Sequence, residues 1–177
     1  RGYIHIGQAA SPAGSLQTAK IESGTQGSGD GIEIHSSGDV LIRDASLNPG
    51  DISSIDESDS DLLVLHAGDF LVRDIYYPNR RGDSPPADMK ALFDGNAYGP
   101  GISGSFSARD IDVHGDNKSG NSQPAVGGSD VTIRNYLSVA ISGDIDTRAH
   151  RSDSSNPGYA GNISITNVEN GITIDGE

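Results

Sequence analysis

The sequence contains no cysteine and no tryptophan, and only 33% of its 177 residues are hydrophobic. Without cysteine there is no disulfide and no thiol chemistry. Small secreted eukaryotic domains usually carry disulfides, so this absence favours a bacterial protein. No stretch approaches the roughly 18 consecutive apolar residues of a membrane-spanning helix, and residues 1–6 lack the pattern of a signal peptide. We therefore expect no insertion into a membrane.

Basic residues are also scarce, with 12 Lys and Arg against 25 Asp and Glu, which gives a formal net charge of −13. Nucleic acids are bound mainly through Lys and Arg that neutralise phosphates, so we expect no nucleic-acid partner. Acidic loops are compatible with Ca²⁺. However, the acidic run at 56–61 lacks the spacing and the glycine of an EF-hand loop. We expect a solvated loop there and no cofactor.

Low hydrophobicity combined with high net charge is typical of disorder, but the few apolar residues are regularly placed. They belong to a recurring seven-residue phrase: a small or polar pair, an apolar residue, a variable residue, a second apolar residue, Arg or Thr, and Asp or Asn. The clearest copies lie at 38–44 and 68–74, a looser copy lies at 104–110, and two more lie at 129–135 and 161–167. Apolar residues two apart predict a strand with one buried face, and the flanking Gly and Asx residues predict turns.

The final Asx residues of these phrases stand at 44, 74, 110, 135 and 167, so the intervals are 30, 36, 25 and 32 residues. Recurrence of strands at such intervals, without helical segments, is typical of a β-solenoid. Strands are expected in pairs, such as 32–34 with 40–42 and 62–65 with 70–72. We predict an all-β parallel β-helix of about six coils that forms one domain over residues 1–177. Both ends read as strands without capping helices, so we expect a fragment or a subunit that stacks on neighbours.

The longest irregular stretch, 78–101, interrupts this pattern. Residues 84–94 contain good helix formers, with Ser84 as a capping residue and Gly95 as a stop. We predict a short helix near 84–94 that leans Leu92 and Phe93 against the side of the solenoid. Insertions of this kind often carry the individual function of a solenoid.

Two stretches in the last third, Ile141 to Thr147 and Gly161 to Gly176, resemble the repeats of filamentous-haemagglutinin-like exoproteins. Gram-negative bacteria export these proteins through an outer-membrane partner, by two-partner secretion. The strands of those repeats similarly contain Gly-Asn-Ile or Gly-Asp-Ile and lie between Gly- and Ser-rich loops. The resemblance is good over 28–50 and 127–176. It implies a right-handed parallel β-helix, export from the cell, and a role in adhesion or in an extracellular matrix. It implies no catalytic residue.

We expect the recurring Asx residues to stack at one bend as a structural ladder, about 4.8 Å apart. The ladder comprises Asp44, Asp74, Asp110, Asn135 and Asn167. The residues before the first four form an expected outward column of arginines, each paired with a neighbouring Asp: Arg43, Arg73, Arg109 and Arg134.

The five histidines, at 5, 35, 66, 114 and 150, share no metal-ligand spacing, so we interpret them as surface residues. Arg81, Gly82 and Asp83 match the integrin-binding tripeptide of animal matrix proteins and form a candidate interaction loop. Asp110, Asp112 and Asp116 are the nearest approach to the clustered carboxylates of β-helix enzymes. They lack a matching partner, and the fold alone confers no activity.

These observations favour a non-enzymatic, extracellular β-solenoid of a bacterial surface adhesin or matrix protein. Its partner would be a cell-surface or glycan receptor. The alternative is a subunit that stacks end to end on copies of itself and builds a filament. A carbohydrate-active β-helix enzyme is a distant third hypothesis.

Overall fold

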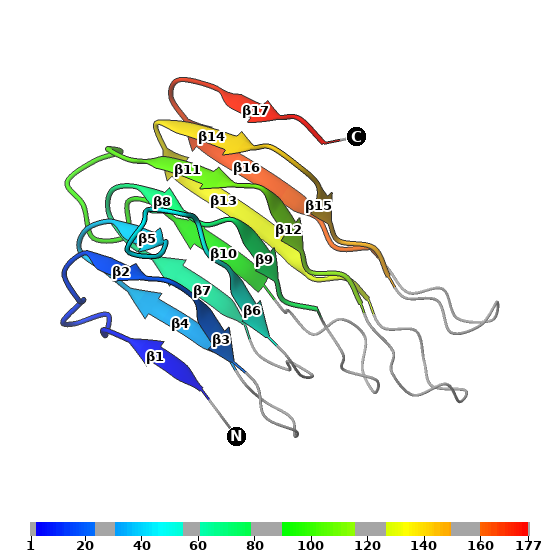
Figure 1. The fold of residues 1–177 in the computed structure, drawn as a ribbon. Helices are drawn as coiled ribbons and strands as arrows, with labels where there is room; N and C mark the ends of the chain where they lie inside the picture. The colour runs from blue at the N-terminus through cyan, green and yellow to red at the C-terminus, as the bar shows by residue number, and fades with distance from the viewer. Residues whose placement is uncertain are drawn as a thin grey trace.

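The computed structural model describes residues 3–23, 31–54, 61–78, 90–115, 127–149 and 160–176. These residues form 17 strands and no helix. The chain passes through three parallel sheets in turn and then starts the next coil, so strands three apart in the sequence lie side by side (Figure 1). The predicted parallel β-solenoid is confirmed. Its right-handed sense, which parallel strand connections almost always take, stays a prediction.

Each sheet is made of every third strand. The first sheet has the order β1 (Ile4–Ile6), β4 (Ile32–His35), β7 (Leu62–Leu65), β10 (Lys90–Asp94), β13 (Asp130–Tyr136) and β16 (Ile163–Val168). The second has the order β2 (Leu16–Thr18), β5 (Val40–Ile42), β8 (Phe70–Leu71), β11 (Ser105–Ala108), β14 (Ser138–Ile141) and β17 (Ile172–Ile174). The third has the order β3 (Ile21–Ser23), β6 (Ile52–Ser54), β9 (Asp74–Tyr76), β12 (Asp110–Asp112) and β15 (Ile145–Asp146).

The core is a set of columns in which each apolar side chain lies on its register partner in the next coil. One column of the first sheet runs through Ile4, Ile32, Leu62, Ala91, Val131 and Ile163. A column of the second sheet runs through Leu16, Val40, Phe70, Phe106, Val139 and Ile172. Full burial of one such side chain stabilises the fold by about 1.5–3 kcal/mol. A narrow interior therefore suffices for a sequence poor in apolar residues.

Aromatic rings fill the middle of the core. Phe70 stacks on Phe106 with a ring-centroid distance of 5.0 Å, and Phe93 contacts both rings. Tyr136 meets Phe106 edge to face at 5.5 Å. All four side chains are at most 1% exposed.

The predicted helix near 84–94 is wrong for residues 90–94, which form strand β10; residues 84–89 lie outside the described ones. Ala91 and Phe93 point into the core and are 1% and 0% exposed. They pair in register with β7 on one side and β13 on the other. Backbone pairing on both sides and burial of Phe93 override the local helix propensity. Phe93 therefore belongs to the core and does not lean against the side of the solenoid.

The coils also contain a third strand, which the predicted pairs of strands did not include. Each strand of the third sheet contributes one apolar residue to a further column, comprising Ile21, Ile52, Ile75, Ile111 and Ile145. The alternation at 111–113 did indicate a strand there, because Ile111 and Val113 are both buried. Ile21 and Ile52 are followed two residues later by Ser, so their strands lack this signal.

Candidate functional site

The five predicted ladder residues lie on two different corners. Asn135 and Asn167 end strands of the first sheet, where both have positive φ angles of 64° and 54°. The Asn167 side-chain amide donates to Asn135 Oδ1 at 2.5 Å, and the Asn135 amide donates to Asp94 Oδ1 at 2.7 Å. A ladder therefore exists here, but its third member is Asp94.

Asp74 and Asp110 are register partners at the corner between the second and third sheets. Asp44 lies outside this column, because residues 43–51 form a longer connection between β5 and β6. Its Oδ1 accepts hydrogen bonds from the backbone N–H groups of Ser46 and Asn48 at 2.8 and 2.9 Å. The hydrogen bonds from Asn48 lower the pKa of the Asp44 carboxyl. Asp44 thus stabilises its own loop and does not bridge two coils.

Arginines alternate with these carboxylates in what we call the Arg–Asp column: Asp51, Arg73, Asp74, Arg109 and Asp110. Arg73 donates two hydrogen bonds to the Asp51 carboxylate, at 2.9 and 2.6 Å. Arg109 donates two to Asp74, at 2.8 and 2.5 Å, and one to Asp110 at 2.9 Å. The predicted pairing of arginines with Asp is confirmed here.

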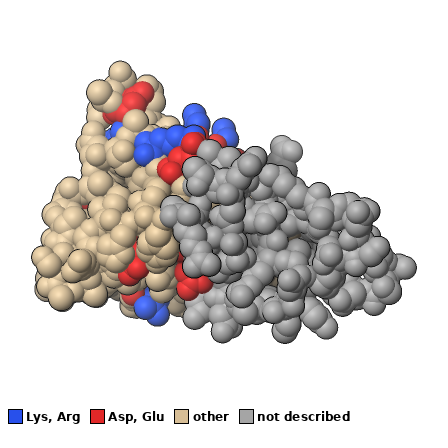
Figure 2. Space-filling view, turned by 90° about the horizontal axis from the view of Figure 1, so that it is seen from below, with Lys and Arg blue, Asp and Glu red and all other residues tan. Residues whose placement is uncertain are grey.

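The other two predicted arginines lie elsewhere. Arg134 belongs to the first sheet and pairs with Asp94, from Nη2 to Oδ2 at 2.8 Å. Arg43 donates to the Gln17 side chain at 3.3 Å. On the face seen in Figure 2, the described basic side chains lie beside acidic ones.

Four carboxylates, of which only Asp110 belongs to the predicted ladder, connect one coil to the next. In four places an Asp Oδ1 accepts a backbone N–H from the following coil, at 2.6–3.0 Å. The pairs are Asp39 with Asp69, Asp69 with Ser105, Asp110 with Asp144, and Asp130 with Asn162. The Asp near the start of several repeated phrases was the sequence signal for these hydrogen bonds. Its recurrence therefore has a structural cause.

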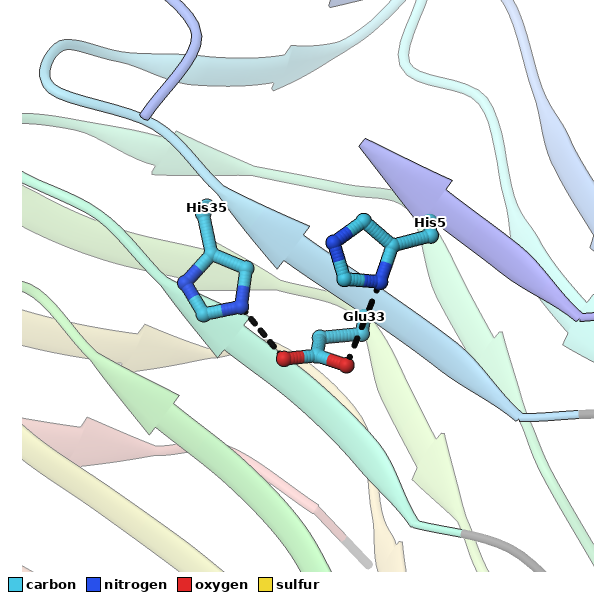
Figure 3. Close-up of side chains that lie close together, drawn as sticks. All are labelled: His5, Glu33 and His35. Atoms are coloured by element: carbon cyan, nitrogen blue, oxygen red, sulfur yellow. Dashed lines mark hydrogen bonds and ion pairs between the residues drawn. The ribbon is translucent and has the colours of Figure 1, made fainter. Parts of the chain in front are cut away.

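One cluster has the composition of a metal centre: His5 from β1 with Glu33 and His35 from β4 (Figure 3). His5 Nδ1 lies 3.4 Å from Glu33 Oε2, and His35 Nε2 contacts Glu33 Oε1. One ligand atom from each residue lies within 4.8 Å of the others. The hydrogen bond with His35 lowers the pKa of the Glu33 carboxyl, against a smaller opposite effect of burial. The carboxylate is therefore ionised at neutral pH.

Two tyrosines flank this cluster. The Tyr3 hydroxyl donates to Glu33 Oε2 at 3.1 Å, and the Tyr98 hydroxyl is hydrogen-bonded to His35 Nδ1. Tyr98 lies on the 95–101 segment, which follows β10 and contacts the earlier coils through the Ala67–Asn96 bridge. Burial raises the pKa values of both tyrosine hydroxyls, so they stay neutral.

The interpretation of the histidines as surface residues is wrong for two of them. The His35 side chain is only 4% exposed. His66 is fully buried, and its Nε2 lies 2.8 Å from the Tyr136 hydroxyl. Burial lowers the pKa of His66 to about 4. His66, Asp94, Asn135 and Tyr136 together form what we call the first-sheet corner. His150 lies outside the described residues.

A second cluster joins Asp112, His114 and Asp146. Asp112 and Asp146 are register partners on β12 and β15, and His114 Nδ1 contacts Asp112 Oδ1. The Arg148 guanidinium donates three hydrogen bonds to the Asp146 carboxylate, at 2.9, 3.0 and 2.6 Å, and they lower the pKa of that carboxyl. This guanidinium competes with any cation.

The remaining residues that the sequence suggested as candidates do not form one cluster among the described residues. Of the Asp110, Asp112 and Asp116 cluster, Asp110 belongs to the Arg–Asp column and Asp112 contacts His114. Asp116 lies outside the described residues, as do Arg81, Gly82 and Asp83. In the part of the chain that the structure describes, no helix is long and apolar enough to cross a membrane.

Comparisons with known proteins found no matching family model, no matching curated protein and no matching solved structure.

Proposed function

We propose that this chain is a non-enzymatic, extracellular β-solenoid segment of a bacterial surface adhesin or matrix protein. The observation that supports this best is that the recurring Asp, Asn and Arg side chains form hydrogen bonds from one coil to the next. A sequence whose repeats encode coil-to-coil bonds is suited to extend a rod and to display its loops.

The resemblance of residues 28–50 and 127–176 to filamentous-haemagglutinin-like repeats supports the same proposal. Export and a bacterial source follow from that resemblance and from the lack of cysteine. The segment before β10, which contains Arg81, Gly82 and Asp83, is the proposed contact with a cell-surface or glycan receptor.

A glycan array tests this proposal, with a control chain that must keep strand β10 intact. Deletion of all of 78–101 would remove β10 and the buried Phe93, so it would damage the core. Replacement of residues 79–89 by a Gly-Ser stretch of equal length leaves β10 in place. We expect the unaltered chain to bind a defined set of glycans and the replaced chain to lose them. An adhesive role for this segment would be contradicted by equal binding of the two chains, or by no binding of either.

A second candidate function is self-stacking into a filament, and the last coil favours it. Ile163, Ile172 and Ile174 lie in the columns that apolar residues of the earlier coils form. A further coil in the same register would continue these columns. The first coil of another copy, with Ile4 and Leu16 in the same columns, offers one, and head-to-tail contacts of this type give filaments.

Negative-stain electron microscopy over a dilution series distinguishes this second function from the first. Filaments that shorten on dilution, and that Ile172→Lys abolishes, would support self-stacking. Leu47→Lys is the matched control, because Leu47 is 61% exposed on a loop away from the last coil. Dispersed short rods at every concentration would exclude the filament.

A further inference from the structure

The backbone register alone brings His5, Glu33 and His35 together. His5 and Glu33 are register partners on the neighbouring parallel strands β1 and β4. Side chains on one face of such a pair start about 4.8 Å apart. Glu33 and His35 are two residues apart on β4, so both point to the outer face, opposite to Ile32 and Ile34. The three side chains therefore converge because of the strand pairing itself.

The donor atoms suit a transition metal better than a hard cation. Two imidazoles and one carboxylate form a ligand set used by zinc, with Zn–N and Zn–O distances of about 2.0–2.2 Å. In such a centre neighbouring donor atoms lie roughly 3–3.5 Å apart. The 3.4 Å between His5 Nδ1 and Glu33 Oε2 already fits that spacing. Ca²⁺ and Mg²⁺ prefer oxygen ligands, and only one residue of the cluster supplies them.

The surroundings of His35 match those of a metal ligand. A metal-bound histidine usually donates its other N–H to a fixed partner, which sets the tautomer and the ring orientation. His35 has such a partner in the Tyr98 hydroxyl at Nδ1, while Nε2 faces Glu33. Without an ion, Nε2 is hydrogen-bonded to Glu33 Oε1; a bound cation would replace the proton of that hydrogen bond, and the proton on Nδ1 would then be donated to the Tyr98 hydroxyl. The Tyr3 hydroxyl holds the other Glu33 oxygen in a comparable way.

We propose that His5, Glu33 and His35 bind one Zn²⁺ ion, with water as the fourth ligand and with Tyr98 as the outer partner of His35. His5 is exposed, so the ion and its water are open to solvent. This inference goes beyond the proposed function and does not depend on it. The ion would connect the first coil to the second, because His5 and Glu33 belong to different coils.

Isothermal titration of the full, tag-free, EDTA-treated chain with ZnCl₂ tests the proposal. We expect one Zn²⁺ per chain and no binding of CaCl₂ at this cluster. His5→Ala should weaken Zn²⁺ binding by more than about 100-fold, beyond the 10–100-fold typical of losing an outer-shell partner. Tyr98→Phe should weaken it by about 10-fold. His5 is exposed, so His5→Ala should leave the circular dichroism spectrum unchanged.

His114→Ala is the matched control, because His114 belongs to the second His–Asp cluster. It should bind Zn²⁺ like the unaltered chain. A Zn²⁺ affinity that is equal in the unaltered chain and His5→Ala, or that falls with His114→Ala instead, would overturn the assignment. X-ray absorption of the zinc-loaded chain gives a second readout, with two imidazole ligands expected for the unaltered chain and one for His5→Ala.

Discussion

The first-sheet corner, through the pair of Asp94 with the adjacent Arg134, and the Arg–Asp column both join aspartate to arginine, but they differ in how far the aspartate is exposed to water. At the first-sheet corner, the Asp94 side chain is 8% exposed, and it holds Arg134 and Asn135 through hydrogen bonds. In the Arg–Asp column, the side chains of Asp51 and Asp74 are 27% and 22% exposed. The arginines of the two sites differ little, at 45% for Arg134 and 49% and 55% for Arg73 and Arg109. Both sites involve the last two residues of a copy of the seven-residue phrase.

The comparison shows that burial, and not residue type, decides what a polar column contributes to stability. Water competes for an exposed ion pair, so such a pair contributes about 0–1 kcal/mol. A buried polar group that loses its partner costs about 1–3 kcal/mol, because no water replaces the lost hydrogen bond. Burial would also raise the pKa of Asp94, yet the hydrogen bonds from Asn135, Asn96 and Arg134 lower it. Four predictions test this difference.

The largest effect is expected from acid acting on the first-sheet corner. The pKa of His66 is about 4 in the folded protein, against 6.5 for a free side chain. Between pH 6.5 and 4 the His66 imidazole is protonated in the unfolded chain but neutral in the folded protein. The free energy of unfolding therefore falls as the pH drops towards 4. The difference corresponds to about 3 kcal/mol. Urea unfolding at several pH values measures it, with His66→Gln as the variant that lacks this contribution. Equal pH dependence in the two chains would contradict the prediction.

A smaller loss is expected for Asp94→Ala. The change leaves Arg134, Asn135 and the backbone N–H of Asn96 without their acceptor. We expect the free energy of unfolding to fall by about 2–3 kcal/mol. Asp94→Asn keeps an acceptor oxygen and should lose less. Chemical denaturation of both variants measures the difference, and a loss below that of Asp74→Ala would reverse the comparison.

Asn135 sharpens the comparison further, because its φ angle of 64° adds a backbone effect. A residue with a Cβ other than Asn or Asp is strained in this region by about 1–2 kcal/mol. Asn135→Ala should therefore destabilise by about 1–2 kcal/mol, through the φ angle and the lost hydrogen bond to Asp94. Asn135→Gly also loses the hydrogen bonds with Asp94 and Asn167, but glycine tolerates the positive φ angle, so this variant should be milder. Thermal unfolding of the two variants separates the contribution of the φ angle from that of the side-chain hydrogen bonds. An Ala variant more stable than the Gly variant would show that the positive φ angle does not limit stability.

The smallest effect is expected in the Arg–Asp column. Arg109→Ala removes three hydrogen bonds to Asp74 and Asp110, but all of them face water. We expect a loss that is smaller than that of Asp94→Ala and that disappears in about 1 M salt, where the Debye length is about 3 Å. Unfolding at low and high salt measures it. A salt-independent loss as large as that of Asp94→Ala would mean that the two sites do not differ.

The sequence predicted the repeating strand well and the corners poorly. Two apolar residues two apart, as in Ile32 and Ile34, are a periodic signal that one strand carries by itself. A corner depends on which strand follows, and the phrases ending at Asp110 and Asn135 look alike although they end strands of different sheets. The 25-residue interval between them does not reveal this difference, because register partners lie 23–40 residues apart, from Ile52 to Ile75 and from Ala91 to Val131.

The candidate metal centre was not predictable for a related reason. His5 and Glu33 meet only because this first coil is 28 residues long, whereas Ile32 and Leu62 in the next coil are 30 residues apart. A shift of one residue would turn one of the two side chains to the opposite face of its strand. Tyr98 reaches His35 from two coils away, through a segment that has no repeat. Contacts of this kind depend on loop lengths, which the repeat does not fix.

The parallel stacking of coils also has a mechanical consequence. A force applied along the rod pulls the last coil away from its neighbour and loads the bonds of one coil at a time. A released coil of 28–40 residues gives about 100–140 Å of extended chain, although it occupied only about 4.8 Å of the rod. Such a rod behaves under tension as an extensible tether that lengthens about 20-fold or more, one coil after another, and it yields long before its backbone is strained.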